Sequence, residues 1–189
     1  MEKENKSRAR LITQVAIMAA VICILGPLSV PIGVIPVSLT PFAVFLTVYL
    51  LGRRLSTASY LIYLLIGLVG VPVFSGFTGG PQKLFGPTGG YLVSFALMAE
   101  IAGFFIDKYR NVAVQYLGCL AGLVCSYFFG TVWLAFEAHL SLWAATQAAV
   151  LPFIGFDLIK IALALAIGKP VKSALMQAHI LKTSSVSSS

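Results

Sequence analysis

The chain has 189 residues, of which 59% are hydrophobic and only 10% are charged, and its mean hydropathy is +0.96. A soluble domain carries about 25% charged residues, so this composition excludes an ordinary water-soluble enzyme, a disulfide-rich secreted domain and a disordered chain. The composition indicates an all-α integral membrane protein with several transmembrane helices.

Proline, glycine and charged residues divide the chain into six apolar segments, and a helix needs about 20 apolar residues to cross a bilayer. No charge lies between Arg10 and Arg53, and the prolines of residues 27–36 predict a tight turn between two spans. The first span follows basic residues, as a signal peptide would, but no small-residue cleavage site follows it, so we expect it to be retained. Pro152 either kinks one long helix or separates a short outer helix from the last span. The predicted spans are residues 11–30, 37–52, 56–72, 89–106, 112–136 and 152–168.

Basic residues flank these spans and predict their orientation. With the N-terminus in the cytoplasm, eleven of the thirteen Lys and Arg residues fall on the cytoplasmic side, whereas Lys83 lies outside and Lys160 within a span. This distribution follows the positive-inside rule, and it predicts a multi-pass protein of the cell (plasma) membrane with both termini cytoplasmic. Because these cations anchor the topology, no nucleic-acid partner is expected. Residues 1–175 are predicted to form one membrane domain, and residues 176–189 a cytoplasmic tail that is mostly disordered.

The sequence holds no recognisable catalytic or metal-binding pattern. His139 falls in an outer loop and His179 in the cytoplasmic tail, and the three cysteines lie inside apolar segments. The only Gly-Lys pair, at Gly168, is followed by proline, so the chain lacks a phosphate-binding loop and is not expected to hydrolyse ATP by itself. We therefore predict no enzyme activity, no metal and no cofactor.

Two ionisable residues inside the last span are the strongest candidates for ligand binding. Asp157 and Lys160 are three residues apart, which places both on one face of a helix, in the outer half of the membrane. Ionisable residues within a span are costly and mark a functional site by default, but an ion pair that only stabilises the bundle is the alternative. Glu100 lies near the cytoplasmic end of the fourth span, where it either has a function or reaches to the membrane surface.

The loop of residues 73–88 is the second candidate. It is rich in glycine and proline yet retains aromatic residues, which favours a lid folded over a cavity, with a plain linker as the alternative. Thr88 is placed to cap the helix that follows, and free amides at a helix start favour an anion. Lys83 is the only external cation.

Ala16 and Ala20 form a small-residue pattern on one face of the first span. Small residues four apart let another helix approach closely. The pattern therefore indicates either docking of a partner helix or close packing within the bundle.

Three stretches together resemble the biotin-specific substrate-binding component (BioY, an S-component) of energy-coupling-factor (ECF) transporters. They are GLVGVPVF at residues 67–74, GPTGGYL at 86–92, and PF followed by DLIK within 152–160, in a match over about residues 8–175. The resemblance implies a six-helix bundle that binds biotin in a pocket open to the outside, closed by the 73–88 lid, and delivers it to the cytoplasm. It also implies that Ala16 and Ala20 dock onto an ECF transmembrane coupling protein driven by two cytoplasmic ATPases. Some members of the family are proposed to work without these partners.

The candidate residues fit the chemistry of biotin. Asp157 is suited to accept N–H bonds from the ureido ring, and Lys160 to donate to its carbonyl. Aromatic side chains are suited to cover the apolar thioether ring, and Lys83 or the amides of residues 88–90 to face the tail carboxylate. The predicted binding residues are Asp157, Lys160, Lys83, Gln82, Gly80, Thr88, Tyr91, Phe74 and Phe85.

One position departs from the family pattern. The family pocket is associated with an asparagine, but the asparagines of this chain, Asn5 and Asn111, are both cytoplasmic in the predicted topology. Gln82 or Gln147 is the candidate replacement. Three other functions stay open: an S-component for thiamine or riboflavin, a small membrane-embedded enzyme that uses Asp157 or Glu100 as a base, and a scaffold without a ligand.

Overall fold

The computed structural model describes residues 2–32 and 35–178 and is mostly helical. Most of the predicted tail, residues 179–189, lies outside the described residues. The helices are α1 (Glu2–Leu25), α2 (Thr40–Leu51), α3 (Arg53–Leu68), α4 (Pro81–Leu84), α5 (Gly89–Lys108), α6 (Val112–Glu137), α7 (Leu142–Ala149) and α8 (Ile154–Gln177), and the strands are β1 (Ser29–Ile32) and β2 (Ile35–Ser38).

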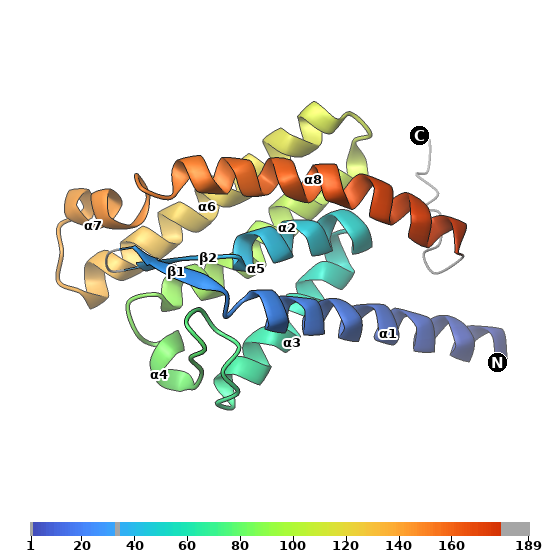
Figure 1. Cartoon of the computed structure of the whole chain (residues 1–189), viewed down its shortest axis with the longest axis horizontal. Coiled ribbons are helices and arrows are strands. Elements are labelled where there is room, and N and C mark those ends of the chain that lie inside the picture. Colours follow the sequence, from blue (N-terminus) through green and yellow to red (C-terminus); the bar gives the residue numbers. More distant parts are fainter. Residues whose placement is uncertain (1, 33–34, 179–189) are drawn as a thin grey trace.

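The long helices alternate in direction, so the two ends of the bundle differ (Figure 1). The start of α1, the α2–α3 and α5–α6 connections and the end of α8 lie at one end, and the β1–β2 hairpin, α4 and α7 lie at the other. Arg53, Lys108 and Arg110 lie in or beside the two connections. The fold therefore places these three cations, which the sequence assigns to the cytoplasmic side, at the same end of the bundle.

Helix α2 lies in the centre of the bundle and packs against α1, α3, α5 and α8. It is apolar on all sides, as expected of a helix that is surrounded by others, and Val44, Phe45 and Val48 are almost completely buried. Pro41 occupies its first turn, where the missing amide is not needed.

Helices α5 and α6 form a tightly packed antiparallel pair. Gly118, Gly122, Ser126 and Gly130 recur every four residues along the face of α6 that meets α5. A Cβ atom added at Gly118 would lie 2.2 Å from Phe105, so only glycine permits this close approach. The hydroxyls of Ser126 and Ser94 are 2.8 Å apart and link the two helices in their buried interface.

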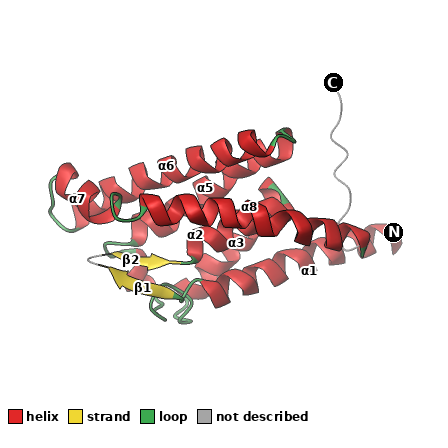
Figure 2. Ribbon diagram, turned by 45° about the horizontal axis from the view of Figure 1, so that its top comes forward, coloured by secondary structure: helices red, strands yellow, loops and turns green. Residues whose placement is uncertain are grey.

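The connection between α1 and α2 is a β-hairpin, whereas the sequence predicts only a tight turn there. Helix α1 ends at Leu25, five residues before the predicted end of the first span, and β1 and β2 pair antiparallel with Ser29 opposite Ser38 and Val30 opposite Val37. The physical reason is that proline interrupts a helix, while the β-branched residues around the turn favour extended pairing. Figure 2 shows this small sheet at one end of an otherwise helical molecule.

Pro152 lies in a break between two helices rather than in a kink of one continuous helix. Helix α7 ends at Ala149, α8 begins at Ile154, and their axes are bent by 50°. Of the two alternatives that the sequence leaves open, the separate short helix is the one observed.

Three described helices are long and apolar enough to cross a bilayer: α1 from Arg8 onward, α5 and α6. The bent pair of α7 and α8 makes a fourth if it counts as one span, and α2 is apolar but has only 12 residues. Length and composition of the described helices therefore support three or four spans. The six-span arrangement stays a prediction.

Candidate ligand-binding site

A cavity of about 60 Å³ lies at the end of the bundle that carries the hairpin and the 73–88 loop. The cavity is small, since this volume holds only a few water molecules. Its walls come from β2, the starts of α2, α5 and α8, the middle of α6, and the end of α7. The lining residues are Pro36, Ser38, Thr40, Pro41, Ser75, Thr88, Tyr91, Leu92, Phe95, Tyr127, Ala149, Phe153, Asp157 and Lys160.

Asp157 and Lys160 form a buried ion pair in this cavity. The Lys160 ammonium donates to Asp157 Oδ1 at 2.7 Å, and the two residues are only 7% and 4% exposed, respectively. The spacing of three residues brings them together on α8, as the sequence predicts. Asp157 also lies in the first turn of α8, where the helix dipole favours a negative charge. Each charge is therefore compensated, as burial requires.

Tyr127 completes the environment of Asp157. Its hydroxyl, on α6, donates to Asp157 Oδ2 at 2.7 Å, so each oxygen of the carboxylate accepts one strong hydrogen bond. These two donors fix the orientation of the carboxylate. The carboxylate retains lone pairs that are free to accept from a bound molecule.

The other cavity walls combine hydroxyl groups with aromatic rings. The Ser38 and Thr40 hydroxyls, 2.6 Å apart, contribute polar groups from β2 and the start of α2. Phe95 and Phe153 contribute apolar walls. A charged pair, several hydroxyls and aromatic rings around one cavity suit a small molecule with a polar head and an apolar body.

The 73–88 loop folds back on the bundle and is tied to it at three points. The Gly76 amide donates to the Pro27 carbonyl at 3.0 Å, the Gly80 amide to the Gly67 carbonyl at 2.7 Å, and the Trp133 indole to the Gly86 carbonyl at 3.0 Å. Ser75 and Thr88, from its two ends, line the cavity. The loop therefore packs against the bundle beside the cavity, and its role as a lid stays a prediction.

Four of the predicted binding residues line the cavity: Asp157, Lys160, Thr88 and Tyr91. Tyr91 is 8% exposed, and its hydroxyl lies 2.9 Å from Thr131 Oγ1. Thr88 occupies the N-cap position of α5, but its side chain makes no capping hydrogen bond, so the predicted side-chain cap is wrong. The Gly89 amide donates to the Gly86 carbonyl at 2.9 Å and is therefore not free for an anion.

The two predicted phenylalanines are not among the residues that line the cavity. Phe74 is fully buried in the core, where its ring meets Tyr63 edge-on and occupies the space that Gly67 leaves open. Phe85 is 64% exposed. Their roles as covers of a bound ring stay predictions.

The predicted polar residues of the loop also lie outside the cavity lining. The Gln82 amide donates to the Gly79 carbonyl at 3.0 Å and packs beside Gly80, whose backbone φ is +92°. Lys83 is partly buried on α4, and this burial lowers the pKa of its ammonium group. Gln147, the other candidate replacement for the family asparagine, is exposed on α7. The predicted contacts of these residues with a ligand therefore stay predictions.

Sequence reasoning did not select Tyr127, Ser38, Thr40, Phe95 and Phe153. Tyr127 and Tyr116 both lie on α6 inside an apolar segment, and only the folded structure distinguishes the tyrosine that reaches Asp157 from the one that donates to the Leu158 carbonyl. A search for hydroxyl-bearing residues within the predicted spans would have found both tyrosines.

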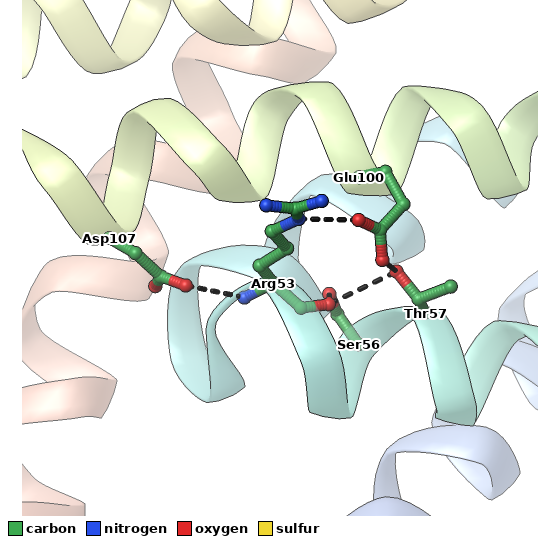
Figure 3. A network of polar contacts seen from close by, with 5 residues as sticks. All are labelled: Arg53, Ser56, Thr57, Glu100 and Asp107. Carbon is green, nitrogen blue, oxygen red and sulfur yellow. Dashed lines mark hydrogen bonds and ion pairs between the residues drawn. The ribbon is translucent and has the colours of Figure 1, made fainter.

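Glu100 belongs to a separate polar network with Arg53, Thr57 and Asp107, beside the start of α3 (Figure 3). It forms an ion pair with Arg53 and accepts a hydrogen bond from the Thr57 hydroxyl at 2.7 Å. The Arg53 amide, at the start of α3, donates to Asp107 Oδ2 at 2.9 Å. Glu100 therefore joins α3 to α5 and takes no part in the cavity.

Ala16 and Ala20 lie on the exposed face of α1. The opposite face is buried through Met18, Ala19 and Ile22. Packing among the described residues therefore does not explain the small-residue pattern, because none of them covers this face of α1.

Comparison with known proteins gives a consistent result. The model of the BioY family matches residues 1–177. The biotin transporter BioY of Thermotoga maritima is 37% identical over 163 residues, which cover 86% of this chain and 96% of that protein. The probable biotin transporter BioY of Pyrococcus horikoshii is 38% identical over 162 residues, with the same two coverages.

A solved structure has the same fold. The crystal structure of the S-component for biotin from an ECF-type ABC transporter superposes with a TM-score of 0.83 at 30% identity, covering 89% of this chain and 94% of that one. Together with the family match over almost the whole chain, this likeness leads to one conclusion. The chain belongs to the BioY family.

Proposed function

We propose that this chain is the biotin-binding S-component of an uptake transporter and carries biotin from outside the cell into the cytoplasm. The observation that carries the proposal is the buried Asp157–Lys160 pair, which faces a cavity under the 73–88 loop in a chain of the BioY family. A transporter component of this kind binds and moves its ligand without converting it, so the chain is not an enzyme.

The cavity offers partners for the ureido group and for the apolar rings of biotin. The Asp157 carboxylate accepts the ureido N–H groups, and the Lys160 ammonium donates to the ureido carbonyl. Tyr91, Phe95 and Phe153 cover the apolar rings. Closure of the loop excludes water and strengthens these polar contacts.

The proposed membrane arrangement has six spans with both termini in the cytoplasm of a plasma-membrane protein. It is supported by the cations at the end of the bundle where α1 starts and α8 ends. It places the cavity near the outer surface, which suits uptake.

The proposed partners are an ECF transmembrane coupling protein and two cytoplasmic ATPases, and ATP acts only through them. Ala16 and Ala20 on the exposed face of α1 form the proposed docking surface. We expect Ala16→Trp to abolish co-purification with the coupling protein, because the larger ring separates the two helices. Val124→Trp, on the exposed face of α6, is the control and should leave co-purification intact.

The site is tested with Asp157→Asn, Lys160→Met and the double variant, measured as equilibrium biotin binding to purified protein. Each single change leaves a buried group without its partner, so stability falls as well as affinity. The double variant removes both charges and recovers stability, but it still lacks the ligand contacts. Near-normal biotin affinity in a stable double variant would show that the pair only supports the bundle.

A further inference from the structure

A second hollow lies at the end of the bundle opposite the cavity, between the start of α3 and the end of α5. Its volume is about 470 Å³, and a smaller hollow of about 330 Å³ adjoins it along α5, where Arg53 and Phe104 line both. We call the larger hollow the α3–α5 crevice. Its walls are Leu51, Leu55 and Phe104 on the apolar side, and Arg53, Arg54, Lys108 and Asp107 on the polar side.

The two carboxylates near the crevice are already engaged with donors. Asp107 accepts the Arg53 amide at 2.9 Å, and Glu100 pairs with the Arg53 side chain and with the Thr57 hydroxyl (Figure 3). Among the described side chains, Arg54 and Lys108 form no ion pair and both are exposed. Arg53, Arg54 and Lys108 outnumber the two carboxylates, Asp107 and Glu100, around the two adjoining hollows, so the described side chains give the crevice a net positive charge.

Lys108 is held at the crevice by aromatic rings. Its ammonium lies 5.2 Å from the centre of the Phe104 ring and 5.5 Å from that of Tyr109. Such contacts orient a cation while leaving its hydrogen-bond donors available to an anion. The Phe104 ring, 42% exposed, continues the crevice toward the middle of α5.

The position of the crevice along the membrane suggests its occupant. Helix α5 is long and apolar enough to cross a bilayer and ends at Lys108. Lys108 and Arg54 therefore lie at the level of the lipid headgroups, and Phe104 and Leu55 face the acyl chains. Basic pockets between transmembrane helices at this level bind anionic lipid headgroups.

We propose that the α3–α5 crevice binds an anionic phospholipid. Arg54 and Lys108 contact its phosphate, and Phe104 and Leu55 contact one acyl chain. Asp107 stays bound to the Arg53 amide. Because its carboxylate repels a phosphate, the headgroup enters the crevice on the side of Arg54 and Lys108. This site is separate from the biotin cavity and does not depend on the ligand bound there.

The test uses the purified full chain in detergent, titrated with phosphatidylglycerol or with phosphatidylcholine of the same acyl chains, and followed by native mass spectrometry. We expect phosphatidylglycerol to bind at least about tenfold more tightly, since each cation contributes to attraction of the anionic headgroup. Arg54→Gln with Lys108→Gln should abolish this preference and leave biotin affinity unchanged, which verifies the fold.

The matched control is Arg110→Gln with Lys169→Gln, which removes two exposed cations at the same end of the bundle but outside the crevice. It should keep the preference for phosphatidylglycerol. Equal binding of the two lipids, or an unchanged preference in Arg54→Gln with Lys108→Gln, would overturn the proposal. So would competition by glycerol phosphate at the concentration where phosphatidylglycerol binds, because the crevice would then bind a soluble anion without its lipid chain.

Discussion

At the residue scale, the central feature is a carboxylate held by two donors. Asp157 receives one hydrogen bond of 2.7 Å from Lys160 and another of 2.7 Å from Tyr127, in a region that is almost closed to water. Such a carboxylate is oriented before a ligand arrives, so little conformational freedom is lost on binding. Tyr127 is in this sense a positioning residue for Asp157.

We predict that Tyr127→Phe weakens biotin binding about tenfold, because a buried carboxylate oxygen loses a hydrogen bond worth about 1–2 kcal/mol. Isothermal titration calorimetry on the purified protein measures the effect. Tyr116→Phe is the control, since Tyr116 lies on the same helix and donates to the Leu158 carbonyl outside the cavity lining. Equal losses in the two variants would contradict a specific role for Tyr127.

Sequence reasoning at this scale succeeds where the contacts are local. The spacing of Asp157 and Lys160 predicts that they share one face of a helix, because residues three apart are neighbours there, and the structure joins them in an ion pair. The contact from Tyr127 joins residues that are 30 apart, and no local pattern encodes it. Phe74 is a second example. Its position in the core depends on the space that Gly67 leaves on α3, and no local pattern predicts that contact.

At the element scale, the close packing of α5 against α6 sets one wall of the cavity. A Cβ atom at Gly130 would lie 2.3 Å from the Tyr91 ring, which lines the cavity. A Cβ atom at Gly118 would lie 2.2 Å from Phe105, which does not. The same helix pair therefore offers two equally tight contacts, one beside the cavity and one far from it.

We predict that Gly130→Ala and Gly118→Ala each lower stability by about 1–3 kcal/mol through overpacking, measured as thermal unfolding in detergent. Only Gly130→Ala should also lower biotin affinity, by several-fold, because it displaces Tyr91. If Gly118→Ala lowers affinity as strongly, the effect comes from general loosening of the bundle and the role of Tyr91 is refuted.

The helices are more predictable than their connections. Apolar length and the prolines predict where helices lie, and each predicted span overlaps one helix, of which α2 has only 12 residues. The β1–β2 hairpin is not predicted, because strands of four residues carry too little alternation to be read from the sequence. The break at Pro152 is left undecided by the sequence, since proline permits either a kink or a new helix start.

At the scale of the whole molecule, the two ends of the bundle differ in charge, and this difference supports the proposed orientation in the membrane. The α2–α3 and α5–α6 connections share one end of the bundle (Figure 1), and Arg53, Arg54, Lys108 and Arg110 lie in or beside them. The cavity is lined by β2 and by the start of α5, which lie toward the other end. The number of spans is harder to predict from the sequence than the distribution of charge. Helices α2 and α3 have only 12 and 16 residues, and α2 is surrounded by other helices.

We predict this orientation to appear in cysteine labelling of intact cells, after the three native cysteines are replaced. Phe77→Cys in the 73–88 loop should react with a membrane-impermeant maleimide from outside, because Phe77 is 66% exposed. Arg110→Cys should react only after the membrane is permeabilised, and Val124→Cys, on the lipid-facing side of α6, should react in neither case. Labelling of Arg110→Cys in intact cells would contradict the proposed topology, because it would place the α5–α6 connection outside the cell.

The function proposed for the chain rests on selective binding of biotin, and equilibrium binding of radiolabelled biotin to the purified protein measures it. We expect saturable binding at one biotin per chain, displaced by unlabelled biotin but not by thiamine or riboflavin. The absence of saturable binding, or displacement of the label by either of the other vitamins, would contradict the proposed function.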